Sequence, residues 1–235
     1  MPKFFRWGLL YLGGMKRELE PELMLDQKQA LAYAQADFED AHSHFVPLFQ
    51  EVFRNPQVNG CVLDLGCGTC DISIRFAKAY PTCTVHGVDG SPAMLKLGCQ
   101  EVEACGLEDR VTLIEGRIPM IQLARANYDV VIGNSLLHHV PEISSIWKFI
   151  ALWAKHDAPI FMMDLVRPSS EKEVRNLVDL YVSNEAPTLK KDFFNSLRAA
   201  YLSKEIEAKL QQLNWKGFKV RQISDRHLIV YGFCP

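Results

Sequence analysis

The sequence has little net charge and no long hydrophobic run, and each shortage excludes a class of protein. Its 235 residues include 26 Lys and Arg against 28 Asp and Glu, a formal net charge of −2. This balance gives no general basic surface for phosphates, so nucleic acid is not an expected partner; the alternative is a local basic patch, in which Lys190, Lys191 and segment 216–221 share a face. The apolar run within residues 1–14 is too short to span a bilayer, and no small-residue cleavage site follows it. We expect either a weak amphipathic anchor there or a true translation start at Met15.

Disulfides and metal clusters are also not expected. The chain has 7 cysteines, an odd number, scattered through apolar segments with no secretory signal before them. Such cysteines are typical of reduced thiols in a cytoplasmic protein, which is the predicted location. Cys67 and Cys70 form a C-x-x-C pair, but no second pair follows. Small side chains packed in a loop therefore explain this pair better than a zinc or redox site, and no metal is predicted.

Apolar runs alternate with helical stretches from about residue 55 onward. A hydrophobic fraction of 48% is sufficient for a globular core in a chain of this length. The runs are apolar at consecutive positions, as in strands covered on both faces. A short link joins the last two runs, which predicts a hairpin and an antiparallel last strand. The pattern predicts an α/β fold with a seven-stranded, mostly parallel sheet and helices on both faces. The expected strands are 61–65, 83–88, 111–115, 128–132, 159–164, 218–223 and 228–233.

Both ends of the chain depart from this alternation. Apolar residues at mixed spacings of three and four predict helix from about residue 20 to residue 53. Ser170 and Glu173 have the spacing of a capping box, which predicts a helix start after the fifth strand. Helices are expected there at 171–182, 191–201 and 204–213. The predicted organisation is an N-terminal extension and helical lid over 1–54 and a core over 55–235, with a helical insertion at about 165–215.

A glycine turn between two acid-ended strands carries the clearest functional signal. The strand containing Asp64 leads into Gly66 and Gly68, which let the backbone turn sharply and approach a ligand. The helix that follows would aim its N-terminal amides at the same place. Asp89 ends the next strand, where a carboxylate can accept both hydroxyls of a ribose. The pattern predicts a nucleoside site, and Asp71 in place of the usual third glycine argues against a nicotinamide dinucleotide.

The stretch from Cys61 to Asp164 resembles motif I and the later motifs of the class I S-adenosylmethionine-dependent methyltransferases. The resemblance implies a Rossmann-like fold, an N-terminal helical lid and S-adenosylmethionine as the cofactor. It implies that Gly66 and Gly68, with Asp64, line the methionine end and that Asp89 holds the ribose. The implied cofactor-binding set is Tyr33, Asp64, Gly66, Cys67, Gly68, Asp89, Gly90, Gly116, Arg117, Ile118, Asn134 and Ser135.

The resemblance also places the adenine at the tip of the third strand, beside Gly116 and the residues after it. The family commonly has an acid directly after this glycine, and this chain has Arg117. Adenine recognition would then rest on backbone groups near Arg117 and Ile118, or Arg117 turns outward.

The run from Gly133 to Pro141 is similar to the family's substrate-facing motif. Asn134 would offer a backbone carbonyl to the amino group of the cofactor. His138 or His139 could act as a general base, because imidazole titrates near neutral pH. The other interpretation is a hydrogen-bonded histidine that supports the loop.

The chain ends are similar to those of a bacterial subgroup of small, mostly uncharacterised members, through segments 19–24, 32–38, 164–168, 192–197 and 224–227. In this fold the N-terminal helices and the insertion cover the methyl group, so Tyr33 would be a lid residue; the alternative is a core tyrosine. Asp164 and Arg167 fall at the sheet edge where ligands bind in open α/β sheets. They would contact the substrate or form an internal ion pair that fixes the insertion.

The expected function is in-line transfer of a methyl group from S-adenosylmethionine to a small-molecule acceptor. Such a reaction mainly needs an aligned nucleophile and exclusion of water, so no fixed catalytic triad is predicted. Two enzyme alternatives keep the cofactor: a tRNA or protein acceptor, and synthesis of a modified S-adenosylmethionine. An alternative of another class is a non-catalytic cofactor-binding module in a biosynthetic complex.

Overall fold

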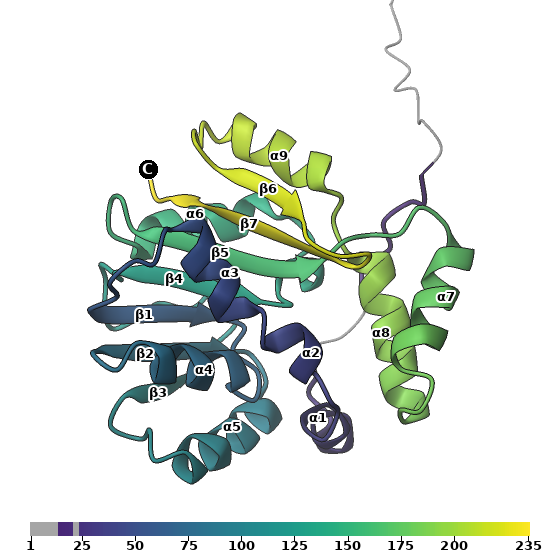
Figure 1. Cartoon of the computed structure of the whole chain (residues 1–235), viewed down its shortest axis with the longest axis horizontal. Helices are drawn as coiled ribbons and strands as arrows, with labels where there is room; N and C mark the ends of the chain where they lie inside the picture. The colour runs from purple at the N-terminus through teal and green to yellow at the C-terminus, as the bar shows by residue number, and fades with distance from the viewer. Residues whose placement is uncertain (1–13, 21–23) are drawn as a thin grey trace, which may run out of the picture.

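A twisted seven-stranded sheet forms the centre of the computed structural model, which describes residues 14–20 and 24–235 (Figure 1). Residues 1–13, on which the anchor prediction rests, and Pro21–Leu23 lie outside the described residues. The strand order is β3-β2-β1-β4-β5-β7-β6. The strands are β1 (Gly60–Leu65), β2 (Cys83–Asp89), β3 (Val111–Glu115), β4 (Val130–Asn134), β5 (Pro159–Leu165), β6 (Lys219–Gln222) and β7 (His227–Phe233).

The pairing directions agree with the sequence prediction. Strands β1 to β5 pair in parallel, and β7 is antiparallel to both of its neighbours, β5 and β6. The fourth strand begins later than the prediction, at Val130, because Tyr128 forms only an isolated bridge with Ala154. The predicted α/β fold with an antiparallel last strand is confirmed.

Helices cover both faces of the sheet because its central strands are apolar at successive positions. Val62 and Val85 point into a core with α3 (Phe45–Val52), α4 (Asp71–Ala79) and α5 (Pro92–Ala104). Leu63 and Leu65 point to the other side, toward α6 (Ser144–Trp153) and α9 (Ser203–Gln212). Neighbouring side chains on a strand face opposite ways, so one continuous apolar run supplies both cores.

The prediction of continuous helix from about residue 20 to residue 53 is wrong. The described residues form three short helices, α1 (Gln27–Ala34), α2 (Glu39–His42) and α3. Asp26 caps α1 by accepting hydrogen bonds from the backbone amides of Lys28 and Gln29. The Asp37 carboxylate likewise accepts from the Glu39 amide at 2.9 Å, at the start of α2. Two aspartates therefore act as start signals within a pattern that periodicity alone reads as one helix.

The insertion after β5 divides between two places. Helices α7 (Glu171–Tyr181) and α8 (Pro187–Ala199) pack on one another, whereas α9 packs against α6 and β6 in the outer layer. Ser170 caps α7, as the sequence predicts, by accepting from the Glu173 amide. Glu173 does not complete the capping box, because its carboxylate accepts instead from the amide of Ser169 at 2.8 Å.

Four short elements gather at one end of the sheet, where the parallel strands terminate: α1 and α2 from the N-terminal part, and α7 and α8 from the insertion (Figure 1). Helix α3, by contrast, buries Phe45 and Phe49 completely in the sheet core. No helix in the described ranges is long and apolar enough to cross a membrane. The division of domains at residue 54 stays a prediction.

Replacing Phe49 with alanine should destabilise the fold strongly. The Phe49 ring is fully buried and packs edge-on against Phe76 and Phe161, so the change leaves a cavity between α3, α4 and β5. We expect a loss of about 3–5 kcal/mol in the free energy of unfolding, measured by urea denaturation. Leu152→Ala, at a side chain that is 63% exposed on α6, should change it by less than about 0.5 kcal/mol. Equal losses in the two variants would contradict this account of the core.

Candidate active site

The strand ends open onto a cavity of about 670 Å³. Its floor comes from the tips of β1, β2, β4 and β5, and its sides come from α1, α2, α7 and α8. This volume is in the usual range for sites that hold an organic ligand. All but one of the twelve predicted cofactor residues line it, the exception being Gly116, and His138 and His139 line it as well.

The turn after β1 adopts a backbone that favours glycine. Gly66 has a φ of +71° and Gly68 a φ of +53°, both in the left-handed region. A Cβ atom added to Gly66 would lie 2.9 Å from Cδ1 of Leu136, in the loop after β4. The absent side chain therefore lets the two loops meet, and the turn leads into the N-terminus of α4 beside the cavity. Cys67 and Cys70 in this turn are free thiols with their sulfurs 3.9 Å apart.

Asp89 joins this turn to the start of α5. One carboxylate oxygen accepts a hydrogen bond from the Gly68 amide at 2.9 Å, and the other accepts from the Ser91 amide at 2.8 Å. Burial raises the pKa of Asp89, although these amide hydrogen bonds oppose the rise. Each carboxylate oxygen keeps a further lone pair, so the group can still accept hydrogen bonds from a ligand.

Asp64 presents an unsatisfied acceptor at the cavity wall. The residue is 1% exposed, and its Oδ2 accepts from the Ser73 hydroxyl at 2.6 Å. Its Oδ1 has no hydrogen-bond partner within the described part of the chain. Burial raises the pKa of Asp64 to about 7, with the negative charge of Asp89 adding to the rise and the bond from Ser73 opposing it. A buried unpaired carboxylate oxygen is costly, so a ligand that donates there would be favoured.

The tip of β3 contributes backbone and loop atoms. The Gly116 amide donates to the Asp89 carbonyl at 2.9 Å, and a Cβ atom on Gly116 would overlap the Ile121 side chain. Gly116 is thus packed beneath the cavity rather than exposed in it, while Arg117 and Ile118 line the wall. The predicted role of Arg117 toward adenine stays a prediction.

Asn134 meets a histidine that the sequence analysis did not single out. Its side-chain Nδ2 lies 3.2 Å from Nε2 of His42, on α2, and Nδ1 of the same imidazole lies 2.8 Å from the Asp71 carboxylate. His42 therefore ties the lid helix to the tips of β4 and α4. Ser135, the next residue, has a φ of +54° and donates its amide to the Met163 carbonyl at 2.9 Å.

Asp164 holds His138 from below the cavity. His138 lies in the short 3-10 helix Leu137–His139, and its Nδ1 is 2.6 Å from the Asp164 carboxylate. Burial alone would raise the pKa of Asp164, but the charge of His138 and its hydrogen bond outweigh burial, and the pKa is lowered. Burial would lower the pKa of His138, but Asp164 outweighs burial and the pKa is raised. The pair therefore favours its charged form.

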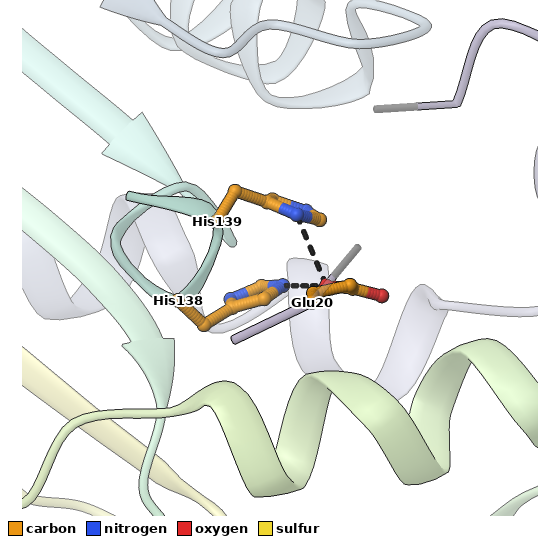
Figure 2. Close-up of side chains that lie close together, drawn as sticks. All are labelled: Glu20, His138 and His139. Carbon is orange, nitrogen blue, oxygen red and sulfur yellow. Dashed lines mark ion pairs between the residues drawn. The ribbon is translucent and has the colours of Figure 1, made fainter. Parts of the chain in front are cut away.

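His139 is held by a residue from the N-terminal segment. Figure 2 shows both imidazoles facing the carboxylate of Glu20, whose Oε2 lies 3.0 Å from His139 Nδ1 and 3.9 Å from His138 Nε2. The Ser196 hydroxyl on α8 donates to the same carboxylate at 3.2 Å. Burial would raise the pKa of Glu20, but the hydrogen bond and charge of His139 outweigh it and lower the pKa.

The remaining predicted residues fall in different places. Tyr33 lines the cavity beside Phe38, and its enclosure raises the pKa of its hydroxyl to about 12. Arg167 lies outside the cavity, where it pairs with Glu205 at 2.6 Å and donates to the Ala200 carbonyl at 2.9 Å. Within the described ranges Asp164 and Arg167 form no ion pair with each other. Asp164 therefore supports His138, and Arg167 fastens α9.

Glu20 and His42 are the site residues that sequence reasoning missed. Neither belongs to a recognisable spacing, since each meets its partners only through the tertiary fold. Glu20 lies 118 positions before His138, and His42 lies 92 positions before Asn134. Glu20 falls in the segment 19–24 noted above, which was its one available signal, and His42 stands among charged and polar residues that give none.

Comparison with known proteins agrees with this architecture. The sequence model of a family described as a methyltransferase domain matches residues 62–157. Demethylmenaquinone methyltransferase from Geobacillus stearothermophilus is 37% identical over 95 residues, or 40% of this chain and 40% of that protein. Protein arginine N-methyltransferase 1 from Schizosaccharomyces pombe is 33% identical over 116 residues, or 49% of this chain and 30% of that protein. The chain thus spans less than half the length of these curated relatives.

Solved structures share the fold over most of the chain. The plantazolicin methyltransferase BpumL, in complex with a desmethylPZN analogue and SAH, superposes with a TM-score of 0.64 at 13% identity, covering 88% of this chain and 95% of that chain. The sheet order, the glycine turn and the acid at the end of β2 define a Rossmann-like methyltransferase domain. Residues 62–157 are therefore similar to methyltransferase domains, and the fold is the one that solved S-adenosylmethionine-dependent methyltransferases share.

Replacing Asp64 with asparagine should stabilise the ligand-free protein at neutral and higher pH. The pKa of Asp64 is about 7 in the folded state and 3.8 ordinarily. At a pH between these two values the folded protein keeps the proton on Asp64, whereas the unfolded chain has lost it. The contribution of Asp64 to the free energy of unfolding therefore falls as pH rises from about 4 to about 7, by at most about 4 kcal/mol. Above about pH 7 this contribution stays constant.

The measurement is urea denaturation of wild type and Asp64→Asn across this pH range. We expect the stability difference to grow with pH up to about 7 and then to stay constant. Asp109→Asn, at an exposed carboxylate, should show no such growth. A stability difference between wild type and Asp64→Asn that does not vary with pH would contradict the assignment.

Proposed function

We propose that this protein transfers a methyl group from S-adenosylmethionine to a small-molecule acceptor. The observation that carries the proposal is the single cavity that contains both the glycine turn after β1 and the histidine pair after β4. The methyltransferase domain match and the structural neighbours support the cofactor. The roof of the cavity supports the small-molecule acceptor class, because α1, α2, α7 and α8 leave a space of limited volume above the strand ends.

The predicted cofactor residues suit the two polar ends of S-adenosylmethionine. The free Oδ1 of Asp64 would accept a hydrogen bond from the ammonium of the methionine part, which would also satisfy an otherwise costly buried acceptor. Asp89 would accept from the ribose hydroxyls with its remaining lone pairs. When bound, the cofactor supplies a methyl group on a positively charged sulfur. The sulfur becomes a neutral thioether once the methyl group has been transferred.

The acceptor would lie between the histidine pair and the aromatic side chains of the cover. Tyr181 and Phe193 line the cavity from α7 and α8, and they offer apolar surface to a partly apolar molecule. We propose that His138 and His139 assist loss of a proton from the acceptor nucleophile. Asp164 and Glu20 would orient the two imidazoles, as carboxylates do in other histidine-dependent sites.

Replacing Asp89 with alanine should weaken S-adenosylmethionine binding by about 10- to 100-fold, because hydrogen bonds to a charged group contribute about 1.5–3 kcal/mol. The measurement is isothermal titration calorimetry on the folded variant, with circular dichroism as the check of folding. Asp109→Ala removes an exposed carboxylate elsewhere and should bind as wild type does. Unchanged affinity in Asp89→Ala would contradict the placement of the ribose.

The acceptor class can be tested by following a labelled methyl group. We incubate the protein with cell extract and methyl-tritiated S-adenosylmethionine, and then pass the mixture through a filter that retains protein and tRNA (cut-off ~3 kDa). We expect the label in the small molecules that pass the filter. His139→Asn should retain cofactor binding and lose this labelling. Label found only in retained RNA or protein would replace the small-molecule proposal with a macromolecular one. Cofactor binding without any labelling would favour a non-catalytic module.

A further inference from the structure

Glu20, His138 and His139 place one carboxylate oxygen and two imidazole nitrogens within 4.8 Å of one another (Figure 2). We propose that these three side chains bind a divalent transition-metal ion of the zinc type at the acceptor end of the cavity. The inference deepens the proposed function, because the ion would lie where the acceptor is activated. The role of the ion therefore rests on the proposed methyl transfer. Its binding can be measured independently of any methyl transfer.

The spacing of the three ligand atoms suits a tetrahedral ion. Zinc holds nitrogen and oxygen ligands at about 2.0–2.1 Å, which places the ligands of a tetrahedral site about 3.3–3.5 Å from each other. Glu20 Oε2 lies 3.0 Å from His139 Nδ1 and 3.9 Å from His138 Nε2, and no pair exceeds 4.8 Å. The observed spacings bracket the required one, so side-chain shifts of about an ångström would complete the site.

Asp164 prepares His138 for such a role. Its carboxylate is 2.6 Å from Nδ1 of His138 and holds the proton on that nitrogen, so Nε2, which lies on the side of Glu20, is the nitrogen that would give up its proton to a metal ion. At 3.9 Å the Nε2 atom and the Glu20 oxygen are too far apart for a hydrogen bond. In zinc sites a histidine that binds the metal through one ring nitrogen usually donates the N–H of its other ring nitrogen to a carboxylate, as His138 can to Asp164.

The local charge also favours a cation. Glu20 and Asp164 are both carboxylates with little exposure, their side chains being 8% and 2% exposed. The nearby cation Arg17 is turned to other partners, since it donates to the carbonyls of His138 and Val140 and its guanidinium lies over the Tyr201 ring. A divalent ion between the imidazoles and Glu20 would replace the imidazole protons that otherwise balance these two buried carboxylates.

The donor set selects among ions and leaves one position open. Two imidazoles and a carboxylate suit zinc and its first-row neighbours, whereas magnesium and calcium prefer oxygen ligands alone. Catalytic zinc sites keep three protein ligands and an exchangeable fourth position. His138 and His139 line the cavity, so the fourth position would face the acceptor space, where the ion could polarise a hydroxyl or thiol.

Zinc binding to the full chain, freed of metal by a chelator, tests the inference. Calorimetric titration with zinc chloride should show one equivalent bound, and cobalt should give a tetrahedral absorption spectrum at the same stoichiometry. Glu20→Gln and His139→Asn should weaken zinc binding by at least about 100-fold, and loss of the supporting carboxylate in Asp164→Asn by about 10- to 100-fold. Retained S-adenosylmethionine binding in each variant shows that it is folded.

Two matched controls separate this site from adventitious binding. His156→Asn removes an imidazole from an exposed histidine–carboxylate pair, His156 and Asp157 at 3.0 Å, and should bind zinc as wild type does. Cys67→Ser, in the C-x-x-C turn, should also leave zinc affinity unchanged. Absence of binding at millimolar zinc, or equal binding in Glu20→Gln and wild type, would overturn the inference. So would a loss of binding in Cys67→Ser.

The outcomes also separate this inference from the proposed function. Methyl transfer by protein that binds no zinc would overturn the metal site alone and leave His139, held by Glu20, as the general base. Zinc binding that depends on Glu20 and His139, in a protein that labels no acceptor, would leave the metal site standing and contradict the proposed methyl transfer.

Discussion

Strands that run parallel must end at the same edge of their sheet, and the site depends on this constraint. β1, β2, β4 and β5 terminate side by side, so loops that are far apart in the sequence meet at one edge. The glycine turn after β1 approaches the loop after β4 because Gly66 has no side chain to collide with Leu136. The apolar strand interiors, covered on both faces, make this edge rigid enough to position polar groups.

Buried carboxylates then join the loops across that edge. Asp89 accepts hydrogen bonds from the amides of Gly68 and Ser91, and Asp164 accepts one from the amide of Leu137 and contacts the imidazole of His138. Each carboxylate lies at the tip of its own strand and holds part of another loop or turn. Charge in a poorly hydrated position is costly unless it is hydrogen-bonded, so these bonds also keep each loop in one arrangement. Binding geometry and local stability are therefore set by the same few side chains.

The cover of the cavity is the part in which this chain differs from a bare Rossmann-like core. The N-terminal segment supplies Glu20 to His139 and His42 to Asn134, and α8 supplies Ser196 to Glu20. The family match ends at residue 157, before α7 and α8 begin. The cover is therefore the part of the cavity that the family match does not include, whereas the tips of β1, β2 and β4 lie within it.

The sequence by itself determined the sheet, its antiparallel last strand and the loop that carries Gly66 and Gly68, because strand burial and tight turns leave local patterns. It also indicated Asp89 through its spacing from Gly68, and the histidine pair through the resemblance of the run 133–141 to a known motif. Only the tertiary structure decided that the N-terminal helix is broken at Asp37, that Arg167 fastens α9, and that Glu20 reaches His139. Those outcomes depend on contacts between distant segments. Glu20 and His139 are 119 positions apart and their side chains lie 3.0 Å from each other, and no local sequence pattern indicates such a contact.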